Sequence, residues 1–111
     1  MNTKKNDKQS SLNTPTTPIA ETTRVDTVTP ELAAEWLKRN ARNRKLLTSV
    51  VDALVDAIQN DRWRVTHQGI AFGADGDLYD GQHRLHAIVK AQQPVDVRVT
   101  RGLPPEARDA I

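Results

Sequence analysis

Apolar residues are almost absent from the beginning of this chain. Of the first 23 residues only Met1, Leu12, Ile19 and Ala20 are apolar, and the others are mainly Lys, Asn, Thr, Ser and Pro. Such a segment buries too little surface to offset the conformational entropy that folding removes. We therefore expect residues 1–22 to form a disordered arm and residues 23–111 to form one small domain.

The sequence also excludes several classes of protein. It contains no cysteine, which rules out disulfides, thiolate metal sites and cysteine nucleophiles. No apolar stretch approaches the roughly 20 residues that a transmembrane helix needs. Lys4 and Lys5 are not followed by the apolar stretch of a signal peptide. We therefore expect a soluble cytoplasmic protein without a membrane partner.

The positive charge is concentrated in the arm. Residues 1–20 contain three lysines and one aspartate, which accounts for the whole net charge of +2. The rest of the chain is neutral overall, so the composition does not indicate a uniformly basic nucleic-acid-binding domain, although a local basic patch stays open. Two interpretations of the arm also stay open: an inert tail, or a cationic arm that contacts phosphate.

Short-range patterns predict both strands and helices in the domain. Thr29, Pro30 and Glu31 form a favourable helix start, with a capping hydroxyl, a proline in the first turn and an acid near the positive end of the dipole. The predicted strands are 23–28, 69–72, 77–79 and 95–100. The predicted helices are 30–39, 48–60 and 82–91, and the buried face of the second consists of Val50, Val51, Leu54, Val55 and Ile58.

This order of elements predicts an α/β (α+β) fold, in which helices pack on a small mixed sheet. The Gly- and Asp-rich turn between 69–72 and 77–79 predicts a hairpin. Pro104, Pro105 and Glu106 predict one more helix, which ends with the sequence at Ile111. Because an isolated helix this short is unstable, we expect either that the domain is truncated after residue 103 or that this end frays.

The segment from Asp80 to His86 has the most distinctive chemistry in the chain. Gly81 stands where a predicted strand turns into a predicted helix, and glycine allows a tight turn and close approach to a ligand. The first backbone N–H groups of a helix lack internal partners, and with the helix dipole they attract anions. Gln82, His83 and Arg84 add side-chain donors at the same end, and Arg84 can hold a phosphate through two parallel hydrogen bonds.

Other interpretations of this segment stay open. Asp80 and Gly81 can form an ordinary capped turn, and Arg84 can be a solvated side chain. His83 and His86 with Asp80 have a spacing that permits metal binding, but no third strong ligand is evident except the distant His67. We therefore expect no resident metal. The common nucleotide-binding motifs with several glycines are absent.

The string Asp80-Gly81-Gln82-His83-Arg84-Leu85, followed by Ala87, resembles the signature of the ParB/sulfiredoxin-like superfamily. It is most similar to the branch named for the string DGQHR, which includes bacterial and phage proteins and the DndB family linked to DNA sulfur modification. In ParB proteins a Gly-Glu-Arg-Arg string opens the equivalent helix and binds the phosphates of CTP. In sulfiredoxins a Gly-Cys-His-Arg string does the same for ATP. The order of elements is compatible with this fold from about Thr23 to Gly102.

The chain also departs from these relatives. Gln82 occupies the position of the reactive cysteine of sulfiredoxins, so we do not expect this chain to reduce sulfinic acids as sulfiredoxins do. ParB proteins have a helix-turn-helix domain after this one, and no such domain follows here, so we do not expect ParB-like reading of DNA sequence. Some relatives are described as ParB-like nucleases, but no carboxylate cluster for metal-assisted hydrolysis is recognisable. Whether the protein is a nucleotide hydrolase, a nuclease or no enzyme stays open, and no catalytic residues are assigned.

A second candidate site is the basic segment 38–45. Its cations are Lys38, Arg39, Arg42, Arg44 and Lys45, with no acid among them. This segment can contact nucleic-acid phosphates or form a solvated loop between helices. Trp63, between two arginines, can stack on a base or pack over a sheet edge, whereas the helical position of Trp36 places it in the core.

The leading hypothesis is a nucleotide-phosphate-binding domain in bacterial or phage DNA-related processes. The ligand is a nucleoside triphosphate, CTP or ATP, with or without Mg²⁺. It is bound by the amides of Gly81 to His83, by Arg84, and by Gln82 and His83 as neutral donors, while Asp80 orients the turn. The alternatives are a DNA-binding or nuclease module using residues 38–45, and a regulatory protein-interaction domain without a ligand. A homodimer or another protein partner stays open.

Overall fold

The computed structural model describes residues 21–40 and 44–110. Its elements are β1 (Thr22–Val28), α1 (Pro30–Leu37), α2 (Thr48–Gln59), β2 (Ile70–Gly73), β3 (Leu78–Asp80), α3 (Gln82–Ala91), β4 (Val95–Leu103) and α4 (Ala107–Ala110). The predicted arm lies outside the described residues except for its last two positions, and Thr22 already belongs to β1. Within the described part, the helices are too short to cross a lipid bilayer.

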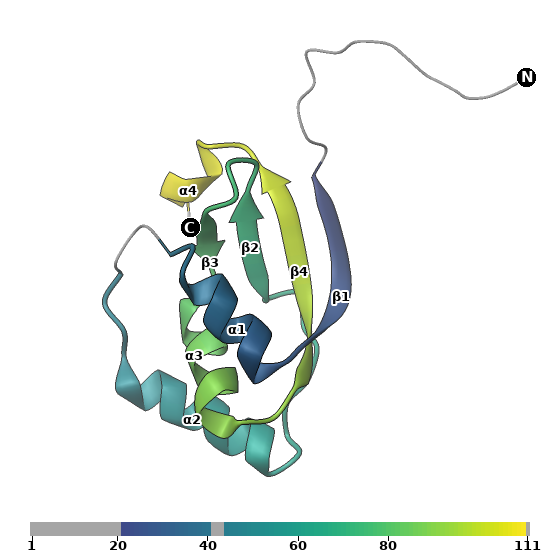
Figure 1. The fold of residues 1–111 in the computed structure, drawn as a ribbon, viewed down its shortest axis with the longest axis vertical. Coiled ribbons are helices and arrows are strands. Elements are labelled where there is room, and N and C mark those ends of the chain that lie inside the picture. Colours follow the sequence, from purple (N-terminus) through teal and green to yellow (C-terminus); the bar gives the residue numbers. More distant parts are fainter. Residues whose placement is uncertain (1–20, 41–43, 111) are drawn as a thin grey trace, which may run out of the picture.

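The four strands form one mixed sheet in the order β1-β4-β2-β3 (Figure 1). Strand β4 pairs antiparallel with β1 and parallel with β2, while β2 and β3 form the predicted antiparallel hairpin. The structure therefore confirms the predicted fold class, a small mixed sheet with helices packed on it. Strand β4 extends three residues beyond the predicted 95–100, because Arg101 pairs with Thr22 and Leu103 pairs with Gly73.

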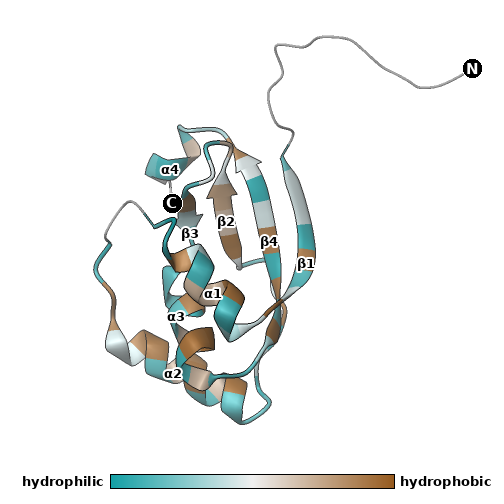
Figure 2. Ribbon diagram, viewed as in Figure 1, coloured by the Kyte–Doolittle hydropathy of each residue, from teal (hydrophilic) through white to brown (hydrophobic). Residues whose placement is uncertain are grey.

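Helices α1 and α3 pack against one face of the sheet (Figure 1), and α1, α2 and α3 share one core with it. Along β4, Val97 and Val99 are buried, whereas Asp96 between the strand's first valines is exposed. Figure 2 shows the same contrast between strands, with the hydrophobic β2 inside the sheet and the mostly hydrophilic β1 at its edge. The largest fully buried side chains are Tyr79, Ile70, Leu78, Leu85, Ile88, Val28, Val97 and Val99.

Helix α2 corrects one detail of the predicted core. Val51 and Ile58 are buried as predicted, and Leu54 and Val55 pack against the core, but Val50 is 39% exposed. Helix α2 contacts mainly α3 and lies at the end of the helical layer (Figure 1). A narrow apolar stripe is enough to cover this main neighbour, which leaves the adjacent Val50 exposed to solvent.

The connection from α2 to β2 lies beside the first half of β4. The indole Nε1 of Trp63 donates to the carbonyl oxygen of Asp96 at 2.9 Å, and Nε of Arg98 donates to the carbonyl oxygen of Thr66 at 3.1 Å. A Cβ atom on Gly69 would lie only 2.0 Å from the carbonyl oxygen of Arg98. These contacts hold the connection against β4 just before it enters the sheet as β2.

The short helix α4 contacts the hairpin. The guanidinium of Arg108 lies 5.5 Å from the centre of the Tyr79 ring, and its Nη1 is 3.8 Å from a carboxylate oxygen of Asp77. The predicted helix after Pro104 is therefore present from Ala107, and it is held by side-chain contacts in addition to its own backbone hydrogen bonds.

Candidate functional site

Gly81 forms the turn from β3 into α3. Its φ of 109° and ψ of 10° lie in the left-handed region, which glycine adopts without the steric cost that other residues incur. A Cβ atom here would also lie 2.9 Å from Cγ1 and 3.0 Å from Cα of Ile70. The predicted strand–glycine–helix arrangement is therefore present. It needs glycine both for the backbone conformation and for close packing on β2.

A pocket of about 290 Å³ opens beside this turn, and we call it the motif pocket. Its lining comes from the connection after α1 and from the β3–α3 junction: Asn40, Arg44, Lys45, Leu78, Tyr79, Asp80, Gly81, Gln82 and His83. Two cations, Arg44 and Lys45, thus lie beside the helix start, which has no side-chain cap. The carboxylate of Asp80 accepts a hydrogen bond from the backbone N–H of Gly81 at 2.9 Å, so it holds the turn.

The side chains of Gln82 and His83 attach the neighbouring segment to α3. Nε2 of Gln82 donates to the carbonyl oxygen of Arg44 at 3.2 Å. Nε2 of His83 accepts from the backbone N–H of Leu47 at 3.0 Å, so this nitrogen carries no proton in the arrangement. Both side chains were expected to donate to a ligand. In the structure they instead hold the backbone of residues 44–47 against the start of α3.

Gln82 also has a buried acceptor without a partner. Its Oε1 atom is inaccessible to solvent and has no hydrogen-bond partner among the described residues. The orientation of the Gln82 side-chain amide is fixed by its contact with Arg44. The carbonyl oxygen of Arg44 can only accept a hydrogen bond, so the NH₂ group of Gln82 must face it and Oε1 must face the opposite way. An unsatisfied buried acceptor destabilises the fold, and a water, hydroxyl or amine at this point would remove that cost.

The structure does not place Arg84 with the other residues of the motif. Its Nη2 donates to Oε1 of Gln68 at 2.9 Å, and its side chain lines a different hollow together with Trp63 and Arg64. Successive residues of an α-helix point about 100° apart, so three consecutive side chains cannot all face one pocket. The expectation that Arg84 holds the same phosphate as Gly81 and His83 is therefore not supported by this geometry.

The described cations of the basic segment 38–45 have different neighbours. Nζ of Lys38 lies 3.5 Å from a carboxylate oxygen of Glu35, and the guanidinium of Arg39 lies 5.7 Å from the centre of the Phe72 ring. Arg42 lies outside the described residues. The last two cations of the segment line the motif pocket, so this part of the segment belongs to the candidate phosphate site.

The two tryptophans have different environments. Trp36 is buried, as predicted. Trp63 is partly buried and packs against the core, and its indole N–H is bonded to the carbonyl oxygen of Asp96. The structure therefore shows the packing interpretation of Trp63, although the residue is not fully buried and also lines the hollow that Arg84 lines.

Two titratable groups around the site favour their neutral forms. Burial raises the pKa of Tyr79, as does its hydroxyl's hydrogen bond to the carboxylate of Asp75 at 3.0 Å. On the next turn of α3, burial lowers the pKa of His86, and the neighbouring His83 lowers it further. Both side chains therefore favour their neutral forms near pH 7, and the charged side chains that line the pocket are Arg44, Lys45 and Asp80.

Within the described ranges, no cluster of three or more His, Asp or Glu side chains could hold a metal ion. Comparison of the chain with protein-family models, curated proteins and solved structures found no match.

The sequence did not indicate every residue of the motif pocket. Leu78 and Tyr79 directly precede the motif, and their place in β3 is the signal that could have assigned them. Arg44 and Lys45 were identified as cations but assigned to a separate nucleic-acid site. For Asn40 the sequence contains no signal, because only the tertiary structure brings the end of α1 to the β3–α3 junction.

Proposed function

We propose that this domain binds the phosphate groups of a nucleoside triphosphate, CTP or ATP, in the motif pocket. The observation that carries the proposal is that Arg44 and Lys45 lie beside the uncapped start of α3. Backbone N–H groups at a helix start, the positive end of the helix dipole and two cations together form an environment that attracts phosphate. The ParB/sulfiredoxin-like resemblance of residues 80–85 supports the same assignment and a setting in bacterial or phage DNA-related processes.

The size of the pocket fits this function. About 290 Å³ is just below the roughly 300–1,000 Å³ of sites that enclose a whole small molecule. The pocket therefore accommodates phosphates, with the nucleoside near its rim. Mg²⁺ would accompany the ligand through its phosphate oxygens, as is usual for this ion. No observation in the described residues favours residues 38–45 as a separate DNA-binding surface, and two of its cations, Arg44 and Lys45, line the motif pocket.

Substitution of Lys45 by alanine should weaken nucleotide binding selectively. Loss of one charge-assisted phosphate contact costs about 1.5–3 kcal/mol, roughly a tenfold to 150-fold increase in Kd. Lys45 is exposed, so the fold should tolerate the change. The measurement is calorimetric titration with CTP, ATP and GTP, with and without Mg²⁺.

Lys38→Ala is the matched control, because it removes the same charge from an exposed residue outside the motif pocket. It should change Kd by less than about twofold, in keeping with the small effect of screened surface charges. If both variants weaken nucleotide binding equally, the nucleotide is attracted only by the overall positive charge of the protein and not by a specific contact with Lys45. Absence of binding to the unsubstituted protein at millimolar nucleotide would refute the proposal. If no ligand then raises the melting temperature, the protein-interaction alternative is favoured.

A further inference from the structure

A second cationic hollow lies on another side of the first turn of α3. It measures about 240 Å³, and its polar and aromatic lining is Arg62, Trp63, Arg64, Thr66, Gln68 and Arg84. The remaining lining residues are apolar, so no acidic side chain contributes to its described wall. We call it the arginine hollow. The motif pocket shares none of its lining residues.

The charges of the hollow are only partly neutralised. Arg62 pairs with Asp56 on α2. In contrast, Arg64 donates to the backbone carbonyl oxygen of Trp63 at 2.9 Å, and Arg84 donates to the neutral side chain of Gln68. Within residues 21–40 and 44–110, neither of these two guanidinium groups has a carboxylate partner. Each therefore keeps its full charge and free donor positions for an external anion.

The hollow is held in shape before any ligand arrives. The bond from Trp63 to the carbonyl of Asp96 anchors one end of its loop to β4, and the bond from Arg98 to the carbonyl of Thr66 anchors the middle. The hydroxyl of Thr66 also accepts from the backbone N–H of Gln68 at 3.2 Å. A preformed arrangement reduces the entropy that binding must overcome.

The combination of residues indicates the ligand class. Guanidinium groups bind phosphate oxygens in pairs of hydrogen bonds, and an accessible indole face stacks on a nucleobase. Trp63 stands between Arg62 and Arg64 in sequence and lines the hollow together with Arg84. We propose that the arginine hollow binds single-stranded nucleic acid, with phosphates on Arg64 and Arg84 and a base against Trp63. This surface is separate from the motif pocket and does not depend on nucleotide binding there.

The test is fluorescence anisotropy with labelled single-stranded oligonucleotides of about 12 nucleotides, within the range of known single-strand sites, over a series of salt concentrations. Binding should weaken steeply as salt rises. Because Trp36 is buried, quenching of the intrinsic fluorescence should report stacking on Trp63. Arg64→Ala and Arg84→Ala should each weaken binding about tenfold. Each should also reduce the slope of log K against log salt by about 0.7.

Arg24→Ala is the matched control, because it removes an arginine from an exposed position on the edge strand β1. It should change the affinity less than twofold. Trp63→Phe keeps the apolar packing but removes the reporting fluorophore, so its binding is followed by anisotropy: the affinity should fall while the salt slope stays nearly unchanged. Circular dichroism melting of each variant separates loss of binding from loss of folding.

Three results would overturn the inference. The first is absence of salt-dependent binding of single strands by the unsubstituted protein. The second is an equal loss of oligonucleotide affinity in Arg24→Ala and Arg64→Ala, which would leave only non-specific electrostatic attraction. The third is equally strong competition by polyglutamate of matched charge without quenching of tryptophan, which would identify the hollow as a site for acidic peptides.

Discussion

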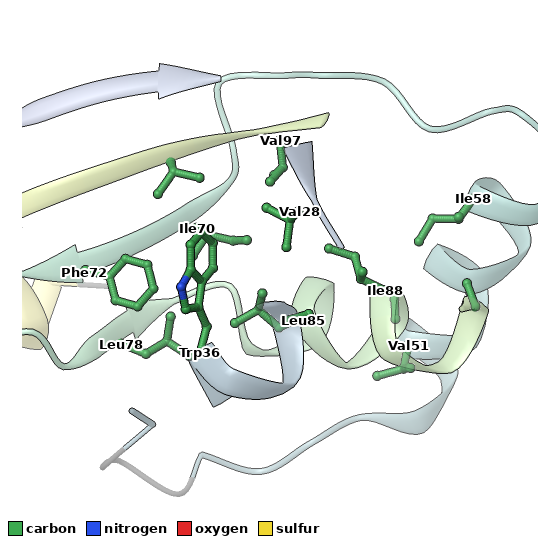
Figure 3. Packing of buried hydrophobic residues seen from close by; sticks show 14 residues of the cluster. Val28, Trp36, Val51, Ile58, Ile70, Phe72, Leu78, Leu85, Ile88 and Val97 are labelled. Atoms are coloured by element: carbon green, nitrogen blue, oxygen red, sulfur yellow. The ribbon is translucent and has the colours of Figure 1, made fainter. Parts of the chain in front are cut away.

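Replacement of Trp36 by alanine should lower the free energy of unfolding by about 3–5 kcal/mol. The side chain is only 5% exposed, and its ring meets Phe72 edge to face with ring centres 5.0 Å apart. Figure 3 shows Trp36 in the core beside Phe72, with Leu85 also close by. A small domain has a stability of only about 5–15 kcal/mol, so this one change removes a large fraction of it.

Arg101, which lies beside the Trp36 ring, adds to the loss of stability expected for Trp36→Ala. The guanidinium of Arg101 lies 5.4 Å from the centre of the Trp36 ring and 5.8 Å from that of Phe72. The same arginine lies 3.3 Å from the carboxylate of Asp26 on β1. Trp36 therefore joins α1 to β2 and β4, and its removal leaves a cavity and takes one of the two aromatic contacts from Arg101.

Urea denaturation followed by circular dichroism measures the loss from Trp36→Ala. Val25→Ala is a suitable control, because Val25 is 48% exposed on the edge strand and should cost less than about 1 kcal/mol. Trp36→Phe should be intermediate, since it keeps an aromatic ring of smaller volume. A loss below about 1 kcal/mol for Trp36→Ala would contradict the packing of α1 on the sheet.

Gly81→Ala should have the second large effect, on stability and on ligand binding together. The left-handed conformation alone costs about 1–2 kcal/mol for a residue with a side chain. The added Cβ would also collide with Ile70, whose nearest atom is 2.9 Å away, so β2 or the start of α3 must shift. A shift of that start re-aims the backbone N–H groups of the motif pocket, and nucleotide affinity should fall at least tenfold, in line with the loss of a charge-assisted contact.

Gly76 offers a control for the conformational part of this effect. It has a φ of 89° in the hairpin turn, but a Cβ atom there would have nothing within 4 Å. Gly76→Ala should therefore show the backbone cost without the collision and without loss of nucleotide binding. Denaturation curves for the two variants give the difference directly. Equal losses would mean that Ile70 moves aside without cost and that the close approach of Gly81 to β2 has no energetic role.

Much of the secondary structure could be predicted because it depends on neighbours in the chain. The start of α1 follows from Thr29, whose side-chain oxygen accepts from the backbone N–H of Leu32 at 3.1 Å, and from Pro30 in the first turn. Helix α3 has the predicted bounds, because Gly81 precedes it and its apolar residues recur with helical period. The exposure of Val50 was not predictable, because it depends on which neighbour α2 has.

The candidate site could be predicted only in part. The segment 80–83 was assigned from the glycine turn and its polar residues, and the structure places all four of these residues around one pocket. The roles of Gln82 and His83 were not predictable, because their partners are the backbone groups of Arg44 and Leu47, far away in sequence. Arg84 was grouped with the motif because it is adjacent in sequence, although adjacency on a helix does not mean a shared direction.

The sequence by itself determined where the strands and helices lie, that glycine turns β3 into α3, and that the helices cover a small mixed sheet. Local periodicity, caps and turns encode the elements and the glycine turn, since these involve residues only a few positions apart. The fold class follows from the order of these elements along the chain. The tertiary structure alone decided that Arg44 and Lys45 join the motif, and that Arg84 joins Arg64 and Trp63 elsewhere. The set of side chains that share a pocket depends on how distant segments pack and on the direction in which each helical residue points. Neither can be predicted from a short segment of the sequence.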